Sequence, residues 1–260
     1  MNPYMWSNPA TIKNIFTLRK RSIQIVGPEE GMSACGEKGV GRLSESSKII
    51  KKINYQLKPN NKQKPLKGIK VLVTSGPTQE PIDEVRYISN YSTGKQGHAI
   101  VEELTTNGAD VILVTGPVKT TKPLAKKVFE VKTAEQMLNK SIKQLPVDIA
   151  ICVAAVSDWK AKELFKGKIK KNKDSINFEF IKNPDILEML SKHNKRPKLV
   201  IGFAAETMEV INFSKQKLIK KECDWILGNK VGLKTDAFGS DDNQICFITH
   251  SKIETWPKMK

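Results

Sequence analysis

The chain has 260 residues, 39% of them hydrophobic, which is enough to bury a core and to form one large domain with an extension. Its 44 Lys and Arg outnumber the 27 Asp and Glu and give a formal net charge of +17. Such a charge would suit a nucleic-acid partner. Only five of the 44 basic residues are Arg, however, and base reading favours the planar Arg fork, so the composition argues against that partner.

Membrane insertion and disulfide bonding are both disfavoured by the sequence. No apolar run approaches the roughly 20 residues of a membrane-spanning helix, and the four cysteines show no C-x-x-C spacing. Cys152, Cys223 and Cys246 lie in apolar, strand-like runs, as buried reduced thiols do, whereas Cys35 lies in a Gly-rich segment. Reduced thiols favour the cytoplasm as the location.

The composition divides the chain into three parts. Residues 1–57 form an irregular segment with Gly clusters, residues 58–67 form a polar linker, and residues 68–260 form a regular domain. About half of the positive charge surplus lies before residue 68, so the regular domain is only modestly basic.

From residue 69 onward, apolar strands alternate with helix-like segments. Strands are predicted at 69–75, 110–115, 148–154, 198–204 and 223–228, and helices near 94–107, 133–145, 183–193 and 207–221. This alternation indicates an α/β fold, a doubly wound, mostly parallel Rossmann-like sheet that is covered on both faces. Two further strands with period-two alternation, 176–181 and 244–250, are expected to form a small antiparallel margin.

The longest loop of the regular domain joins its first strand to the helix near 94. Ligands of doubly wound sheets bind beyond the carboxyl ends of the strands, where this loop lies. It ends in four residues that are predicted to contact a phosphate: Ser92, Thr93, Gly94 and Lys95. The alternative is an ordinary Ser or Thr helix cap. Neither a P-loop nor a dinucleotide-binding Gly fingerprint is present.

Two groups of lysines offer further anion contacts. The segment 160–173 carries seven Lys and one Glu, and we expect it to close as a lid over a polyphosphate. The alternative is a solvated loop, which is common for blocks of like charge. Lys217 and Lys221 lie four residues apart on one predicted helix and therefore share a face that could reach one anion. Alone, such a pair is more typical of a surface.

Several motifs in a fixed order resemble a known family. They are GPTQEPIDEVRYISNYSTGKQG, AAVSDW, KIKK, KNPDIL and GFAAET. Through them, residues 68–250 resemble the phosphopantothenate-cysteine ligase domain of the bacterial bifunctional coenzyme A biosynthesis protein. Near the start, MNPYMW and ACGEKGVGRL resemble the final third of the flavin-dependent phosphopantothenoylcysteine decarboxylase domain that precedes the ligase in that protein.

The resemblance implies a two-step ligation. CTP activates the carboxylate of 4'-phosphopantothenate as an acyl-cytidylate, and the amine of L-cysteine then displaces CMP to form an amide. A carboxylate is a poor electrophile until it carries a good leaving group, and the anionic reactants must be neutralised while they are aligned. Mg2+ is expected with the nucleotide phosphates. The family also implies a homodimer of ligase domains, and the preference for CTP over ATP rests on the resemblance alone.

The resemblance also implies individual roles. It makes Asn90 the residue that positions the acyl group, Arg86 a contact for an anionic substrate group, and Lys168 a contact for the CTP phosphates. Further nucleotide contacts are implied at Cys152, Val153, Ala154, Asp158, Pro184, Asp185, Ile186, Leu187, Phe203, Lys217 and Lys221. Plainer alternatives remain open: a turn-forming Asn at 90, a helix start at 183–185 with Pro184 in the first helical position, and core packing of Phe203.

The decarboxylase-like part carries two implied site residues. The resemblance makes Cys35 the proton donor and Asn2 a contact for the substrate carboxylate. The flavin-binding loops and the catalytic histidine of that family have no counterpart here, so we expect no decarboxylase activity from this chain alone. FMN is expected only if the remaining half is supplied, for example by a separate decarboxylase chain. The sequence also leaves no room for the family's final helix after residue 250, which is expected to reduce stability.

Two other classes of function remain open from sequence. A non-catalytic polyanion-binding module would suit the charge and would bind nucleic acid with a steep dependence on salt. A nicotinamide- or flavin-linked oxidoreductase would suit the fold, although its fingerprint is missing. The ligase class differs from both because it requires pyrophosphate release from CTP that depends on phosphopantothenate.

Overall fold

The computed structural model describes residues 1–21, 23–57, 64–170, 175–232 and 242–259. The chain divides into two units, Met1–Gln63 and Lys64–Lys260, and each is considered by itself. The predicted domain limits at 57 and 68 stay predictions, because most of the linker lies outside the described residues. No helix within those residues combines the length and the apolar character that crossing a membrane requires.

The first unit consists of three helices and one hairpin. Its elements are α1 (Pro3–Ser7), α2 (Pro9–Lys20), β1 (Glu29–Met32), β2 (Lys38–Arg42) and α3 (Ser46–Leu57). Asn2 and Asn8 cap α1 and α2, each followed by Pro in the first turn, which satisfies backbone amides that would otherwise lack a partner. None of the hydrophobic side chains described in this unit is buried, and Leu43 is 76% exposed. Its described residues therefore form no core of their own.

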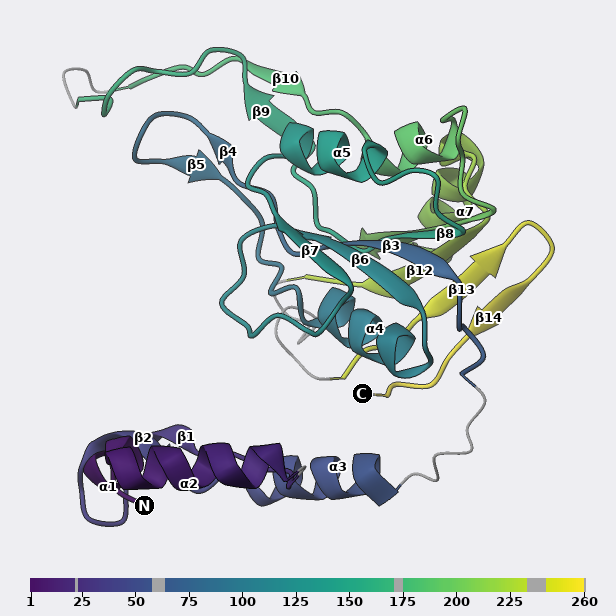
Figure 1. Cartoon of the computed structure of the whole chain (residues 1–260). Helices are drawn as coiled ribbons and strands as arrows, with labels where there is room; N and C mark the ends of the chain where they lie inside the picture. Colours follow the sequence, from purple (N-terminus) through teal and green to yellow (C-terminus); the bar gives the residue numbers. More distant parts are fainter. Residues whose placement is uncertain (22, 58–63, 171–174, 233–241, 260) are drawn as a thin grey trace. The chain divides into compact units, whose positions relative to one another are not determined.

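The second unit is built on one eight-stranded sheet (Figure 1). Its strands are β3 (Lys70–Ser75), β6 (Asp110–Thr115), β7 (Lys127–Glu130), β8 (Ile149–Cys152), β11 (Leu199–Glu206), β12 (Trp225–Lys230), β13 (Cys246–Thr249) and β14 (Ile253–Thr255). They lie in the order β14-β13-β12-β11-β8-β3-β6-β7. The six strands from β12 to β7 are parallel, and β13 and β14 add an antiparallel margin. The predicted α/β fold is confirmed.

Helices cover both faces of this sheet. Figure 1 shows α5 (Ala134–Ile142), α6 (Ile186–Ser191) and α7 (Val210–Lys221) over one face and α4 (Lys95–Thr106) over the other. The alternation of strand side chains separates two clusters. Leu72 packs beneath α5 and α6 with Met137 and Leu190, whereas Val71 and Val73 pack with Val101 of α4. Burial on both faces explains the near-continuous apolar runs of the central strands.

One predicted strand of the margin is wrong. The segment 176–181 contributes β10 (Phe180–Lys182), which pairs antiparallel with β9 (Trp159–Ala161) in a separate two-stranded ribbon. The long loop after β3 forms a similar hairpin of β4 (Glu80–Pro81) and β5 (Tyr87–Ile88). Figure 1 shows both hairpins extending from the carboxyl edge of the sheet. The exposed Phe180 and Ile181 explain why alternation alone misplaced the strand.

Helix α6 is shorter than the predicted helix 183–193. Its N-cap is Asp185, whose side chain accepts a hydrogen bond from the amide of Glu188, so Pro184 lies before the helix and not in its first turn. The alternative of a helix start with Pro184 in the first helical position is therefore wrong in detail, because the helix begins at Ile186. Strands β7 and β14 were not predicted, because β7 is mostly exposed and β14 has only three residues.

The close approach of α4 to β3 depends on Gly97. A Cβ atom at this position would lie 2.3 Å from the Ser75 hydroxyl oxygen and 2.6 Å from the Ser75 Cβ atom. Because both residues are buried, neither neighbour has free space into which to move. The first turn of α4 can therefore reach the end of β3 only if residue 97 lacks a side chain.

We predict that Gly97→Ala lowers the free energy of unfolding of the second unit by about 1–3 kcal/mol, the usual cost of overpacking a core. Urea unfolding measures it. The matched control is Gln96→Ala, which adds helix propensity in the adjacent position without entering the contact with Ser75. Equal stability of Gly97→Ala and the unmodified chain would contradict the contact.

Candidate functional site

The sheet has one topological switch point, and it lies between β3 and β8. From β3 the chain adds β6 and β7 on one side and later returns to add β8, β11 and β12 on the other side. The loops that follow β3 and β8 therefore leave the sheet in opposite directions and open a crevice between them, which is the usual ligand position in such folds. The motifs GPTQEPIDEVRYISNYSTGKQG and AAVSDW occupy these two loops.

Asn90 joins the two loops across the switch point. Its amide nitrogen donates to the carbonyl oxygen of Ala155 at 2.5 Å, and its side-chain oxygen accepts from the amide of Ser92 at 3.1 Å. The residue is half-buried. The second contact is that of a turn-forming Asn, but the first reaches 65 positions along the chain. Asn90 therefore does more than shape its own turn.

Thr78 strengthens the same junction. Its amide donates to the Ala155 carbonyl oxygen at 3.2 Å, and its hydroxyl oxygen accepts from the amide of Ser157 at 2.9 Å. Ser89 in turn donates to the Thr78 carbonyl oxygen. Thr78 is fully buried, so these bonds are shielded from water. The crevice thus has a rigid floor that holds Asn90 in place.

The start of α4 lies at this crevice and lacks a side-chain cap. Its N-cap is Gly94, with a positive φ of 76° that favours glycine, and glycine has no side chain that could cap the helix. The alternative of an ordinary Ser or Thr cap is therefore wrong. Ser92 accepts only from the amide of Gly94, at 3.4 Å. Uncapped amides at a helix start suit an anion, so the geometry is compatible with the phosphate contact predicted for 92–95.

Some of the residues implied as nucleotide contacts lie at the carboxyl ends of β8 and β11 or contact residues there. Asn183 bridges two of them: its backbone amide donates to the Asp158 carbonyl oxygen at 2.8 Å, and Pro184 and Asp185 follow it directly. Lys217 reaches from α7 to donate to the Phe203 carbonyl oxygen at 2.8 Å.

The side chains of Ile186 and Leu187 are buried in the core, at 4% and 7% exposure. Only their backbone is therefore placed to contact a ligand. Phe203 packs against the cluster beneath α4, which agrees with the core-packing alternative for its side chain.

Lys221 takes part in an ion-pair network and not in a shared site with Lys217. Its ammonium group lies 2.7 Å from Asp185 and 2.9 Å from Glu188, which also pairs with Lys192 at 3.0 Å. Hydrogen bonds from Lys221 and Lys192 lower the pKa of Glu188 to about 2. Burial acts to lower the pKa of Lys221, but the bonds to Asp185 and Glu188 outweigh it and raise the pKa overall. The two lysines share a face, as predicted, but contact different partners.

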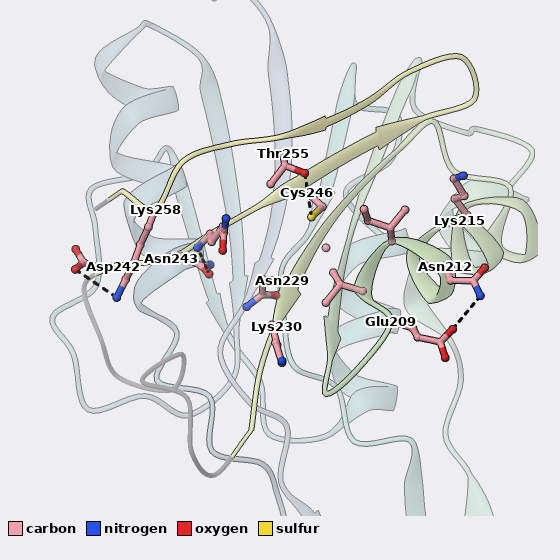
Figure 2. Close-up of a pocket in the computed structure, with 14 residues that line it drawn as sticks. Glu209, Asn212, Lys215, Asn229, Lys230, Asp242, Asn243, Cys246, Thr255 and Lys258 are labelled. Atoms are coloured by element: carbon pink, nitrogen blue, oxygen red, sulfur yellow. Dashed lines mark hydrogen bonds and ion pairs between the residues drawn. The ribbon is translucent and has the colours of Figure 1, made fainter.

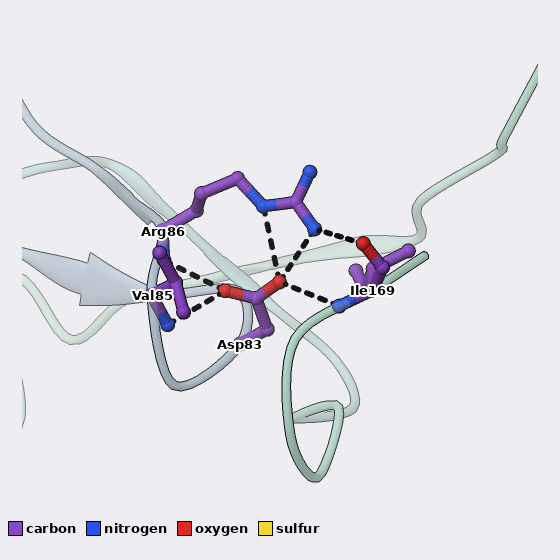
Figure 3. Close-up of polar contacts among 4 residues, drawn as sticks. All are labelled: Asp83, Val85, Arg86 and Ile169. Carbon is purple, nitrogen blue, oxygen red and sulfur yellow. Dashed lines mark hydrogen bonds and ion pairs between the residues drawn. The ribbon is translucent and has the colours of Figure 1, made fainter. Parts of the chain in front are cut away.

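Arg86 contacts a buried carboxylate, Asp83, that the sequence analysis did not single out, and Lys168 is the residue before Ile169, whose amide donates to the same carboxylate. Figure 3 shows the Asp83 cluster, which consists of Asp83, Val85, Arg86 and Ile169. The Arg86 guanidinium donates twice to Asp83, at 2.6 and 3.0 Å, and once to the Ile169 carbonyl oxygen at 3.2 Å. Lys168, next to Ile169, is exposed and forms no hydrogen bond or ion pair with any described residue. Lys171 and Lys173 of the predicted lid lie outside the described residues.

A cavity of about 950 Å³ opens at the carboxyl end of β12 (Figure 2). The sequence analysis assigned no role to its lining, which includes Glu209, Asn212, Lys215, Asn229, Lys230 and Lys258. Asn229 is 8% exposed, and its side chain forms no hydrogen bond with a described residue. Gly228-Asn229-Lys230, which follows an apolar strand in the sequence, is a signal that could have indicated this position. None of the implied nucleotide contacts lines this cavity.

The first unit brings together its own two implied site residues. Asn2 and Cys35 both line a cavity of about 570 Å³, which is also bounded by Met5, Arg42 and Glu45. Cys35 is exposed in the turn between β1 and β2. Asn2 accepts from the amide of Met5 at 2.8 Å through its side-chain oxygen, so its amide nitrogen faces away from that bond.

Residues 66–260 match the family described as DNA/pantothenate metabolism flavoprotein C-terminal domain, which is three quarters of the chain. The chain belongs to this family. Residues 1–58 match a second family, described as Flavoprotein. The boundary between the two units, after Gln63, lies in the short interval between the two matches, so each match corresponds to one unit.

Known relatives of this family extend beyond the chain. It is 38% identical over 246 residues to the coenzyme A biosynthesis bifunctional protein CoaBC of Haemophilus influenzae, a match that covers 94% of the chain and 60% of that protein. The chain thus spans about 60% of the length of this relative.

Solved structures agree with the fold of the second unit. The C-terminal domain of a coenzyme A biosynthesis bifunctional protein CoaBC has a TM-score of 0.62 and 32% identity, covering 75% of this chain and 88% of that one. A mutant of Cab2 in complex with phosphopantothenate-cysteine has a TM-score of 0.56 and 20% identity, covering 83% of this chain and 88% of that one. The second likeness shows the fold alone.

The four thiols are all free, as predicted from their spacing, but they differ in burial. Burial raises the pKa of the Cys152 thiol to about 12 and that of Cys223 to about 11, so both are unreactive at neutral pH. The prediction of buried thiols is confirmed for Cys223, whereas Cys152 and Cys246 are half-buried, and Cys246 lines the larger cavity. Cys152, at the end of β8, is expected to meet a nucleotide only through its backbone.

We predict that Glu188→Gln destabilises the second unit at pH 7, lowering Tm by roughly 2–4 °C. The lowered pKa means that the carboxylate contributes its full stabilisation above its ordinary value of 4.5 and loses it as the pH falls toward about 2. The difference in Tm should therefore be constant above pH 5 and shrink below pH 4.5. Glu163→Gln, at an exposed carboxylate, is the control; equal Tm of Glu188→Gln and the unmodified chain at pH 7 would contradict the network.

Proposed function

We propose that the second unit is a phosphopantothenate-cysteine ligase that acts in coenzyme A biosynthesis. The observation that carries this proposal is the Asn90–Ala155 hydrogen bond, which unites the two motif-bearing loops at the switch point of the sheet. Membership of the DNA/pantothenate metabolism flavoprotein C-terminal domain family and the similarity to CoaBC proteins support it. The complex of Cab2 with phosphopantothenate-cysteine names a ligand for the same fold.

The proposed reaction has two balanced steps. In the first, a carboxylate oxygen of 4'-phosphopantothenate attacks the α-phosphorus of CTP, the new P–O bond forms, and pyrophosphate leaves. In the second, the amine of L-cysteine attacks the acyl carbon, the C–N bond forms, and CMP leaves while the amine loses a proton. The protein contributes mainly alignment of the reactants and neutralisation of their charge.

In this proposal Asn90 holds the acyl group above the floor formed by Thr78 and Ala155. Its amide nitrogen already points at a carbonyl oxygen, so a small rotation can offer the same donor to the acyl oxygen of a bound substrate. The uncapped start of α4 then offers its amides to a phosphate, beside Lys95. A side chain fixed by two further hydrogen-bonded residues loses little freedom on binding, which favours alignment.

The nucleotide would lie along the ends of β8 and β11, with Lys168 as the phosphate contact. No group of three His, Cys, Asp or Glu side chains converges as a metal site within the described residues. Mg2+ therefore would be held by the nucleotide phosphates and water, and it would supply charge neutralisation there. CTP stands as the nucleotide through the resemblance, and the cytoplasm as the location is supported by the four free thiols.

The first unit is proposed to be part of a flavin-dependent decarboxylase domain. Its match to the Flavoprotein family and the shared cavity of Asn2 and Cys35 support this. FMN and decarboxylation are proposed only for an assembly that holds further flavoprotein segments, because the described residues of this unit form no core. Within such an assembly, the exposed Cys35 would act as the proton donor.

We predict that the chain releases pyrophosphate from CTP only when 4'-phosphopantothenate is present, and that adding L-cysteine then yields the amide and CMP. Asn90→Asp should lower overall ligation about 10²-fold, since misplaced reacting groups cost that much. A coupled pyrophosphate assay with and without cysteine measures both half-reactions. The control is Asn139→Asp, the same change at an exposed helix position.

Three results would count against the proposal. Pyrophosphate release that ignores phosphopantothenate, or unimpaired ligation by Asn90→Asp, would remove the assigned chemistry. Salt-sensitive nucleic-acid binding without any CTP turnover would instead favour the polyanion-binding module.

The second unit is also proposed to form a homodimer through its two hairpins. Val85, Tyr87, Leu164 and Phe165 on these hairpins are 59%, 54%, 61% and 39% exposed, and the hairpins lie against each other, with a bridge between Asp83 and Phe165. Contiguous exposed apolar groups are typical of an interface. Sedimentation equilibrium should give twice the chain mass, and Phe165→Ser should shift the chain toward monomer; a monomer at every concentration would contradict the dimer.

A further inference from the structure

The Asp83 carboxylate has an unusual number of partners for a residue at the turn of a two-stranded hairpin. One oxygen accepts from the amides of Val85 at 2.8 Å and Arg86 at 2.7 Å. The other accepts from the Arg86 guanidinium twice and from the amide of Ile169 at 3.1 Å. The Asp83 side chain is fully buried. Five donors on one buried carboxylate fix its position closely.

These bonds connect segments far apart in the chain. Asp83 lies in the turn between β4 and β5, whereas Ile169 lies in the Lys-rich segment after β9, 86 positions away. The tie runs in both directions, because Asp83 accepts from the Ile169 amide while Arg86 donates to the Ile169 carbonyl oxygen. Both backbone groups of one residue are therefore held. A second tie, from the Phe165 amide to the Ile82 carbonyl oxygen at 3.1 Å, lies four residues earlier.

The carboxylate is held in its charged form. The Arg86 guanidinium beside it keeps the pKa of Asp83 well below its usual range, against the opposing effect of burial. The cluster therefore persists unchanged across the neutral and moderately acidic range. A neutral side chain of the same size would satisfy fewer of the five donors and would leave the guanidinium without its counter-charge.

We propose that Asp83 is the positioning residue for Lys168, joining the β4–β5 hairpin and residues 165–170 of the Lys-rich segment into one rigid body. Lys168 precedes Ile169 directly, so fixing the amide of Ile169 fixes the peptide bond between them and the direction in which the Lys168 side chain leaves the backbone. The same body carries Arg86. This inference rests on the proposed ligase function. In it, Asp83 does not touch the substrate and acts only by fixing the position of Lys168.

This arrangement changes what the predicted lid can do. A solvated Lys-rich loop would sample many positions, and each would cost conformational entropy when a triphosphate orders it. Held at Ile169, the segment presents Lys168 with its backbone already ordered, so the nucleotide has fewer backbone positions to immobilise. Lys168 is then free to use its ammonium group, since it has no competing partner among the described residues.

The first test needs no enzymatic activity. Hydrogen–deuterium exchange of the amide of Ile169 is measured in the full chain, in Asp83→Asn and in Glu84→Gln, the exposed neighbouring carboxylate. We expect exchange at Ile169 to become at least about tenfold faster in Asp83→Asn, since a hydrogen bond to a charged group is lost. Glu84→Gln should leave it unchanged. Unchanged exchange in Asp83→Asn would overturn the tie.

The second test is a double-mutant cycle on nucleotide activation, using Asp83→Asn, Lys168→Gln and both together. Asp83→Asn alone should raise KM for CTP more than it lowers kcat, by about tenfold, because a positioning loss weakens binding of the phosphates. In the Lys168→Gln background the same change should cost less than about twofold. Additive effects would overturn the proposal, since a merely structural Asp83 would act independently of Lys168.

If Asp83→Asn does not fold, a second variant tests the same hydrogen bond. Ile169→Pro removes the amide that donates to Asp83, at a half-buried loop position, and should reproduce the rise in KM; an unchanged KM would overturn the tie. If the unmodified chain shows no CTP turnover at all, the ligase proposal fails. The exchange experiment still decides whether Asp83 holds Ile169, so the two failures are distinguishable.

Discussion

The crevice of the second unit exists because the chain adds later strands on opposite sides of β3. Strands are added on one side of β3 as far as β7, and on the other side from β8 onward, so the loops after β3 and β8 part at the carboxyl edge of the sheet. The contacts of Asn90 and Thr78 run between these two loops. The hydrogen bonds of Thr78 and Asn90 to Ala155 close the floor that this parting would otherwise leave open. The fold thus supplies the crevice, and two polar side chains give it a fixed shape.

Both the net positive charge of the chain and the ion pairs that some of its basic residues form bear on the proposed site. The basic excess of the whole chain is large, yet the cationic groups nearest the proposed site divide into two kinds. Arg86 and Lys221 are committed to Asp83, Asp185 and Glu188, and these pairs stiffen the loops. Lys168 is exposed on a segment held by Asp83, and so it can meet a ligand. An unpaired group such as Lys168 can neutralise a triphosphate, whereas the paired groups hold the loops that place Lys168.

Much of the fold could be predicted from the sequence, because burial on both faces of a parallel sheet leaves a strong apolar signal. The strand predicted at 69–75 and the helix predicted near 94–107 are examples, which correspond to β3 and α4. The strand predicted at 176–181 was misplaced because an alternating pattern indicates one covered face but does not identify the strand that pairs with it. Its actual partner, β9, has only three residues and gives little signal of its own. Edge strands such as β7 give little signal because few of their side chains are buried.

The site was less predictable than the fold, for a similar reason. Motif order pointed to Asn90 and Lys168, and the structure connects the first to Ala155, but neither residue type nor spacing could show that Asp83 would reach Ile169. An Asp two or three residues before its own turn amides reads as a local turn former. The Asp83 carboxylate accepts from four donors nearby in the sequence and from the distant amide of Ile169, and this last bond can be recognised only from the positions of both loops. Likewise, only packing could separate Lys217, which meets a carbonyl oxygen, from Lys221, which meets two carboxylates.

The lack of buried hydrophobic side chains among the described residues of the first unit has a calorimetric consequence. Heat absorbed on melting comes largely from apolar contacts and ordered hydrogen bonds inside a core, at about 0.7 kcal/mol per residue for ordinary globular domains. A chain in which only Lys64–Lys260 holds such a core should absorb less than this per residue when heated alone. Restoration of the ordinary value on mixing with another polypeptide would reveal that the first unit had acquired its missing interior.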